Sequence, residues 1–184
     1  MTRSKARIVV LLLLVLSTLS LVGAQQRAPQ AQVAQDAKTA TLDQRLPIGP
    51  EITVGKLPNG LSYYVRANKL PLNRAELRLV VNAGSVLEDA DQQGLAHFTE
   101  HIAFNGTTHF AKNELIRFME SIGMRFGPSV NAYTSFDETV YMLMVPTDKP
   151  DVIEKAFLIL EDWSHNLSFD STEIDKERGV IVKE

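Results

Sequence analysis

Alternating hydrophobic and polar residues predict β-strands in the first part of the chain. Two short runs rich in β-branched and aromatic residues, 52–54 and 61–65, flank Asn59-Gly60, a dipeptide that is typical of tight hairpin turns. The next run, 75–82, alternates apolar with more polar positions, as a half-buried strand does. We therefore expect a hairpin followed by a third strand.

The period then changes to that of helices. After Gly94, apolar residues recur at spacings of three and four over 95–103, and Asn105-Gly106 follows as a helix C-terminal cap would. A second helix is predicted over 112–122, with its apolar residues on one face. These two helices follow the three predicted strands.

Strand and helix patterns alternate again in the last third of the chain. Residues 131–145 have a strand-like pattern, and Pro150 opens an apolar helix that reaches Trp163. A further helix begins at 170–173, with a small polar cap and an acidic first turn, and continues to Glu184 without a stop signal. The sequence therefore predicts an α+β fold, a mixed and mainly antiparallel sheet packed with helices, in a fragment of a longer protein.

The N-terminus has the layout of a secretory signal peptide. Three basic residues precede an apolar stretch of about 12 to 15 residues, shorter than the ~20 that a membrane-spanning helix needs, and small residues precede position 25. We interpret 1–24 as a cleaved signal peptide, with a retained membrane anchor as the alternative. Residues 25–50, rich in Gln, Ala, Thr and Pro, are interpreted as a flexible leader, and 51–184 as the folded domain.

Composition narrows the chemistry. The formal net charge is -3, and charges of both signs are well mixed, so no basic stripe indicates a nucleic-acid partner. The chain has no cysteine, which excludes disulfides, thiolate metal sites and cysteine nucleophiles. Any metal ion must therefore be bound by His, Asp or Glu.

One short motif carries the candidate chemistry. His97 and His101 are four residues apart, so on a helix both imidazoles project from one face and can share a metal ion. Glu100 lies on the same side and can reach a water molecule on that metal as a general base. The order His-x-x-Glu-His inverts the commoner His-Glu-x-x-His zinc motif. The alternative is a helix with two surface histidines.

The residues around this motif favour the zinc-site interpretation, because they resemble the signatures of the insulinase or pitrilysin family of zinc metallopeptidases. The resemblance covers about residues 50–184, in the family's order. It is carried by five segments, 82–85, 94–107, 131–134, 139–141 and 177–184.

The resemblance implies roles for further residues. A glutamate on a later helix would be the third zinc ligand, here Glu184, with Glu177 near it in the outer shell of a catalytic Zn²⁺ site. Asn131 and Ala132 would bind the backbone of an extended peptide by strand addition. The alternatives are a solvated acidic helix face for the two glutamates and an ordinary strand for Asn131-Ala132.

The resemblance also implies a function for the whole protein. We expect a zinc metalloendopeptidase that cleaves peptides or unfolded polypeptides inside a chamber, which the rest of the polypeptide or a homologous subunit completes. Export would place it in the bacterial periplasm, or outside the cell or on a membrane. The rivals are a non-catalytic partner subunit and a metal-binding module without protease activity. His109 and His165 are expected to be surface or loop histidines, and Asp137 and Glu138 loop acids.

Overall fold

The computed structural model describes residues 45–184, which lie in two compact units that divide between Ala67 and Asn68. The predicted signal peptide and most of the predicted leader lie outside the described residues. Residues 45–49 contain no helix or strand. The first strand begins at Ile52, next to the predicted start of the folded domain.

The first unit contains the predicted hairpin. Strands β1 (Ile52–Lys56) and β2 (Ser62–Arg66) pair antiparallel. In the turn, the Asn59 side-chain oxygen accepts a hydrogen bond from Leu61 N at 3.1 Å, and Gly60 has a φ of 95°. A positive φ is easily adopted by glycine, which explains why the Asn-Gly pair forms this turn.

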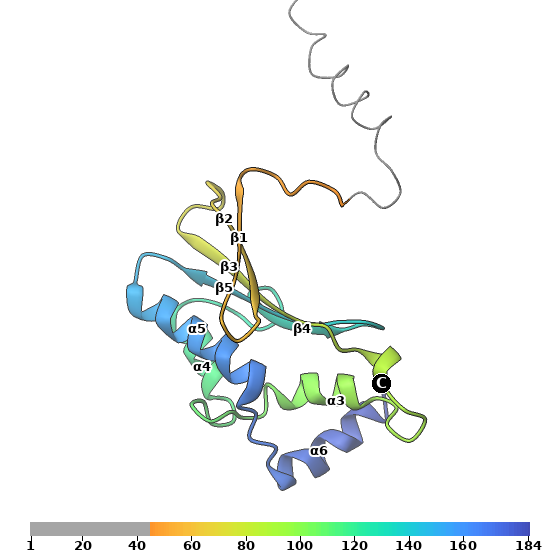
Figure 1. The fold of residues 1–184 in the computed structure, drawn as a ribbon. Coiled ribbons are helices and arrows are strands. Elements are labelled where there is room, and N and C mark those ends of the chain that lie inside the picture. The colour runs from red at the N-terminus through yellow and green to blue at the C-terminus, as the bar shows by residue number, and fades with distance from the viewer. Residues whose placement is uncertain (1–44) are drawn as a thin grey trace, which may run out of the picture. The chain divides into compact units, whose positions relative to one another are not determined.

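The second unit is built on a three-stranded antiparallel sheet with the order β3-β5-β4 (Figure 1). The predicted third strand is β3 (Arg74–Val81). The predicted run 131–145 forms two strands, β4 (Val130–Thr134) and β5 (Thr139–Pro146), joined by a tight turn. β5 is therefore the central strand, and β4 is an edge of this sheet.

The helices occur in the predicted order. After a short 3-10 helix, η1 (Ser85–Leu87), come α3 (Leu95–Ile102), α4 (Glu114–Ser121), α5 (Pro150–His165) and α6 (Ser171–Ile181).

Three predicted helix boundaries were wrong by two or three residues. α5 continues to His165, two residues past the predicted Trp163. α4 begins later than predicted because Asn113 has a φ of 65°, in the left-handed region that asparagine tolerates. α6 ends at Ile181, because Lys183 N and Glu184 N bond to carbonyls three residues back, which tightens the last turn beyond an α-helix.

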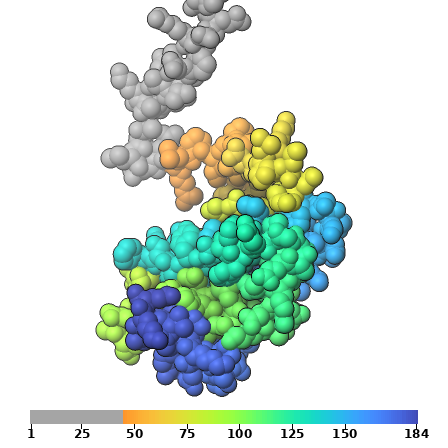
Figure 2. All heavy atoms as spheres, turned by 180° about the vertical axis from the view of Figure 1, so that it is seen from behind, coloured from red at the N-terminus to blue at the C-terminus, as the bar shows by residue number. Residues whose placement is uncertain are grey.

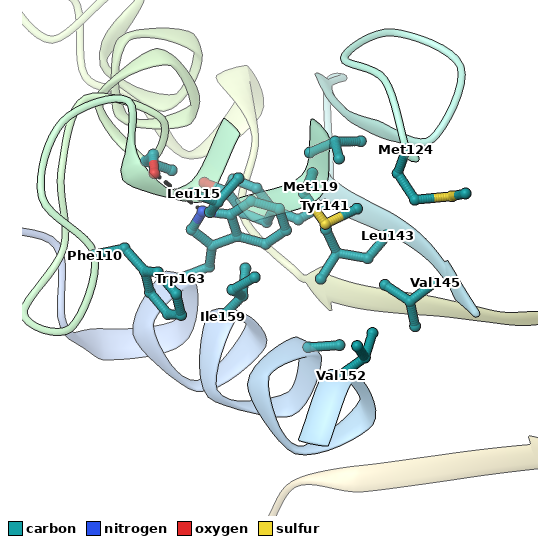
Figure 3. Close-up of a cluster of buried hydrophobic side chains, with 13 residues drawn as sticks. Phe110, Leu115, Met119, Met124, Tyr141, Leu143, Val145, Val152, Ile159 and Trp163 are labelled. Atoms are coloured by element: carbon teal, nitrogen blue, oxygen red, sulfur yellow. Dashed lines mark hydrogen bonds between the residues drawn. The ribbon is translucent and has the colours of Figure 1, made fainter. Parts of the chain in front are cut away.

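The core of the second unit lies between the sheet and α4 and α5 (Figure 3). Trp163 stacks near Tyr141 with ring centroids 5.1 Å apart, and its indole nitrogen donates to Ala103 O at 3.0 Å. Ile159 and Leu143 are fully buried. The antiparallel sheets and helices confirm the α+β prediction. Within residues 45–184, no helix combines the length and apolar character needed to cross a membrane.

Candidate metal centre

α3 carries the two histidines and the glutamate of the central motif. Glu88, in the loop before α3, binds the start of the helix: its carboxylate accepts hydrogen bonds from Gly94 N and Ala96 N, both at 2.8 Å. These backbone hydrogen bonds hold the pKa of Glu88 below its usual range. The free N–H groups and the helix dipole favour a negative charge at the N-terminus of a helix, so Glu88 anchors the start of α3, next to His97.

Three side chains converge beside α3. His97 Nε2 and His101 Nε2 are 3.1 Å apart, and Glu184 Oε2 lies 3.5 Å from the first and 3.6 Å from the second. Ligand atoms about 2.0–2.1 Å from a tetrahedral zinc ion are about 3.3 Å apart. The spacing therefore fits a metal ion held between these three atoms, and the three residues form a group that could hold one.

A fourth residue orients one of the histidines. Glu177 Oε1 lies 2.7 Å from His101 Nδ1. A carboxylate only accepts, so Nδ1 carries the hydrogen, and Nε2 of a neutral ring then directs its lone pair toward His97 and Glu184. A cation between these groups would offset the repulsion between that lone pair and the Glu184 carboxylate. The donor set therefore fits zinc, which favours imidazole and carboxylate ligands.

α6 reaches α3 through these carboxylates. Glu177 and Glu184 are two helical turns apart, and both contact α3 although α6 ends earlier than predicted. The C-terminal residues (dark blue) lie against the light-green segment that includes α3 (Figure 2). The structure thus brings together His97, His101, Glu177 and Glu184.

Glu100 points to the other side of the site, toward the sheet. It is buried, and its Oε2 accepts a hydrogen bond from the Thr134 hydroxyl at 2.7 Å. Burial and then the nearby Glu100 charge raise the pKa of Tyr141 to about 12, so this phenol stays protonated at neutral pH. Glu100 thus accepts from a neutral hydroxyl, that of Thr134, and it is not one of the three converging side chains.

An open pocket of about 550 Å³ joins the motif to the edge strand. His97 and Glu100 line it, together with Ala132 and Thr134 of β4. Asn131 is exposed at the start of this segment, and its Oδ1 accepts from Ala132 N at 3.0 Å. The structure therefore brings Ala132 to the pocket and Asn131 to the exposed side of the same strand.

Two other histidines are outside this centre. His109 donates from Nδ1 to the fully buried Asp162 at 2.8 Å, so the prediction of a plain loop histidine missed a structural contact. His165, the last residue of α5, is exposed and its Nδ1 lies 2.7 Å from Ser164 Oγ. Glu138 accepts from the Tyr133 hydroxyl beside the turn that follows β4.

Sequence reasoning missed three residues that support the centre. They are Glu88 at the start of α3, Thr134 beside Glu100, and Asn105, whose Nδ2 donates to Glu177 Oε2 at 2.9 Å. The polar residue two positions after Ala132, on the same strand face, was a usable signal for Thr134. No spacing rule connects Glu88 or Asn105 to its partner.

The chain is similar to known proteins over most of its described residues. The family model described as insulinase (peptidase family M16) matches residues 63–184, two thirds of the chain and all of the site. The chain belongs to the insulinase family. Relatives in this family include the zinc protease PQQL-like of Arabidopsis thaliana, 41% identical over 88% of this chain, and the probable zinc protease PqqL of Haemophilus influenzae, 44% identical over 76%.

A solved member of the insulinase family has the same fold. The first half of the periplasmic protease PqqL from Escherichia coli superposes with a TM-score of 0.72 and 40% identity, over 75% of this chain and 30% of that one. The chain spans only 18% and 15% of the length of the Arabidopsis and Haemophilus relatives. The resemblance predicted from the sequence is confirmed.

Proposed function

We propose that the full protein is a zinc-dependent endopeptidase and that this chain supplies its metal centre. The observation that carries the proposal is the convergence of His97 Nε2, His101 Nε2 and Glu184 Oε2 at separations of 3.1–3.6 Å. Three protein ligands leave a fourth tetrahedral position open for water, as catalytic zinc sites do and closed structural sites do not. The names of the relatives support zinc as the metal.

His97, His101 and Glu184 would hold the zinc ion, and Glu177 would keep His101 in the binding orientation. When bound, the metal supplies Lewis-acid chemistry: it lowers the pKa of water toward about 7 and polarises a carbonyl group. Glu177 contributes through the 2.7 Å contact with His101 Nδ1, the usual carboxylate–histidine support of a metal ligand.

Glu100 would be the general base. It lies between His97 and His101 on α3 and lines the same pocket as His97. The Thr134 hydroxyl donates a hydrogen bond to one of its oxygens. The other oxygen can accept a proton from the attacking water and deliver it to the leaving amine. The Thr134 contact supports this role because it fixes the carboxylate without neutralising it.

The substrate would bind as an extra strand beside β4. Met144 N donates to Ser129 O across the β4–β5 pairing. By the alternation of antiparallel ladders, the backbone N–H and C=O of Asn131 also point to β5. Ala132 therefore turns its N–H and C=O to the open edge, where an extended peptide could pair with them next to the pocket. Asn131 would act through its contact with Ala132 N.

The wider setting of the enzyme extends the same proposal. Peptides or unfolded polypeptides would be the substrates, and the remaining polypeptide or a homologous subunit would complete the chamber. Residues 1–24 would direct export, and the Escherichia coli neighbour is described as periplasmic, which supports a periplasmic location. No basic stripe in the 184-residue sequence indicates a nucleic-acid partner.

The test is metal content and cleavage of a quenched fluorescent peptide library by the full-length protein. Glu100→Gln should keep zinc and lose cleavage by about 10²- to 10⁴-fold. Glu184→Gln should lose zinc. Glu154→Gln, at an exposed position of α5, is the matched control and should match wild type.

Any of three results would contradict the proposal. A wild-type protein without bound metal or cleavage would support the partner-subunit alternative. A Glu100→Gln variant with normal cleavage would exclude Glu100 as the base, and bound zinc without any cleavage would support a metal-binding module.

A further inference from the structure

We propose that Asn105 is a positioning residue for the metal centre, acting on His101 through Glu177. The inference rests on the proposed zinc site and adds a residue outside its ligands. Asn105 Nδ2 donates to Glu177 Oε2 at 2.9 Å, while the other oxygen of the same carboxylate contacts His101 Nδ1 at 2.7 Å. One carboxylate thus bridges the amide and the imidazole.

The orientation of the Asn105 amide follows from its neighbours. Its Nδ2 faces the Glu177 carboxylate and lies 3.4 Å from His101 O, and both groups are acceptors. Only the NH₂ end of the amide fits there, because the oxygen end would face two other oxygens. The donor therefore points to Glu177.

The backbone on both sides of Asn105 is anchored to the protein interior. Ala103 O accepts from the buried Trp163 indole at 3.0 Å. Gly106 O accepts from Ser168 N at 3.1 Å and from Ser168 Oγ at 2.9 Å. Asn105 is therefore fixed by the core-anchored segment after α3, and it offers Glu177 a reference point that does not belong to α6.

This anchoring matters because α6 has little apolar packing of its own. None of its residues is buried, so the angle of the Glu177 carboxylate depends on its polar contacts. Without the Asn105 donor, one carboxylate oxygen loses its partner and the group can rotate about the His101 contact. The imidazole would then be less firmly oriented, and the metal would bind more weakly.

The first test is the zinc dissociation constant of full-length Asn105→Leu, measured by competition with a chromophoric chelator. Leucine has nearly the size of asparagine and donates no hydrogen bond. Removing direct outer-shell partners costs about 10–100-fold in metal affinity, so this more remote residue should cost about three- to tenfold. The absorption spectrum of the Co²⁺-substituted variant should change as well, because the His101 ring is reoriented.

A reciprocal exchange separates this role from a merely structural one. Asn105→Asp places two carboxylates face to face, and Glu177→Gln places the NH₂ groups of two amides face to face. Each single variant should therefore bind zinc more weakly than wild type. In the double variant, the amide introduced at position 177 can donate to the carboxylate introduced at position 105 and still accept from His101. The double variant should therefore bind zinc more tightly than either single variant, an effect that general loss of folding would not produce.

Two outcomes would overturn the inference. One is an Asn105→Leu variant with wild-type zinc affinity and Co²⁺ spectrum, and the other is a double variant that binds zinc no more tightly than the tighter-binding of the two single variants. Both are distinct from failure of the proposed function, in which the wild-type protein itself binds no zinc. Thermal unfolding of each variant shows that the compared proteins are folded.

Discussion

The two helices in the last third of the chain are held in place by different forces. α5 buries five residues, including Ile159 and Trp163, whereas α6 buries none. Glu177 of α6 and Glu184, which follows the end of α6, contact the histidines of α3. Ile174 and Ile181 add only half-buried apolar surface to α6. The fold therefore rests on α5, and the position of α6 depends on the same polar groups that form the proposed metal centre.

The largest expected effect is in the core. Ile159→Ala should lower the free energy of unfolding by about 4 kcal/mol, through lost burial and a cavity. Urea unfolding followed by the fluorescence of Trp163, the only tryptophan of the chain, measures it. The control Val180→Ala, at an exposed position of α6, should change the free energy by less than about 0.5 kcal/mol. Equal effects of the two variants would contradict the comparison.

A buried charge on α5 gives the next effect. Asp162 accepts hydrogen bonds from Thr107 and His109, and Asp162→Asn should cost about 3 kcal/mol because buried donors then lose their acceptor. Burial raises the pKa of Asp162, but these hydrogen bonds outweigh it and hold the pKa below its usual range.

The sign of the pH dependence follows from this lowered pKa. The contribution of Asp162 is complete above the unfolded-state pKa of about 3.9 and is lost as the pH falls through the folded-state pKa. Acidification below about pH 4 should therefore destabilise wild type more than Asp162→Asn. Parallel stability curves for the two proteins over this range would show that the carboxylate does not have this role.

Metal removal should act mainly on α6. A bound ion that links α3 to α6 stabilises the contact by about 2.7 kcal/mol when its free concentration is a hundred times the dissociation constant. Chelation should therefore speed amide hydrogen exchange in α6 by up to about a hundredfold and leave the buried part of α5 unchanged. Uniform acceleration in both helices would mean that the metal stabilises the whole unit.

The smallest expected effect is at the start of α6. The Asp170 side chain accepts from Thr172 N and Glu173 N, and Asp170→Ala should cost the helix about 1 kcal/mol. Hydrogen exchange in the first turn of α6 measures this, with Asp148→Ala, in the loop before α5, as the control. An unchanged first turn would indicate that the ion pair of Glu173 with Lys112 is enough to hold it.

Local sequence patterns predicted most elements of the fold and the pair of histidines in the candidate site. The hairpin follows from Asn59-Gly60, and the proximity of the two histidines follows from the spacing of His97 and His101 on one helix. The start of α4 was missed because its N-terminal boundary depends on the backbone angle of Asn113, which sequence periodicity does not report.

The missed supporting residues depend on contacts distant in sequence. Asn105 is 72 residues from Glu177, and Thr134 is 34 from Glu100. The sequence alone indicates only a helix cap for Asn105, because its side-chain partner is on another helix. Such contacts come from packing, and periodicity in one segment does not predict them.

The hydrogen bond between Asn131 Oδ1 and Ala132 N has a consequence for solubility. An open strand edge is a template on which any extended chain can pair, including another copy of the same protein. Asn131 covers the outward N–H of Ala132 with its own side chain, at 3.0 Å. A bound peptide must therefore displace the Asn131 side chain before it can pair with Ala132 N. Another copy of the protein that pairs with this edge without displacing Asn131 forms one backbone hydrogen bond fewer, which disfavours self-association and fibre growth.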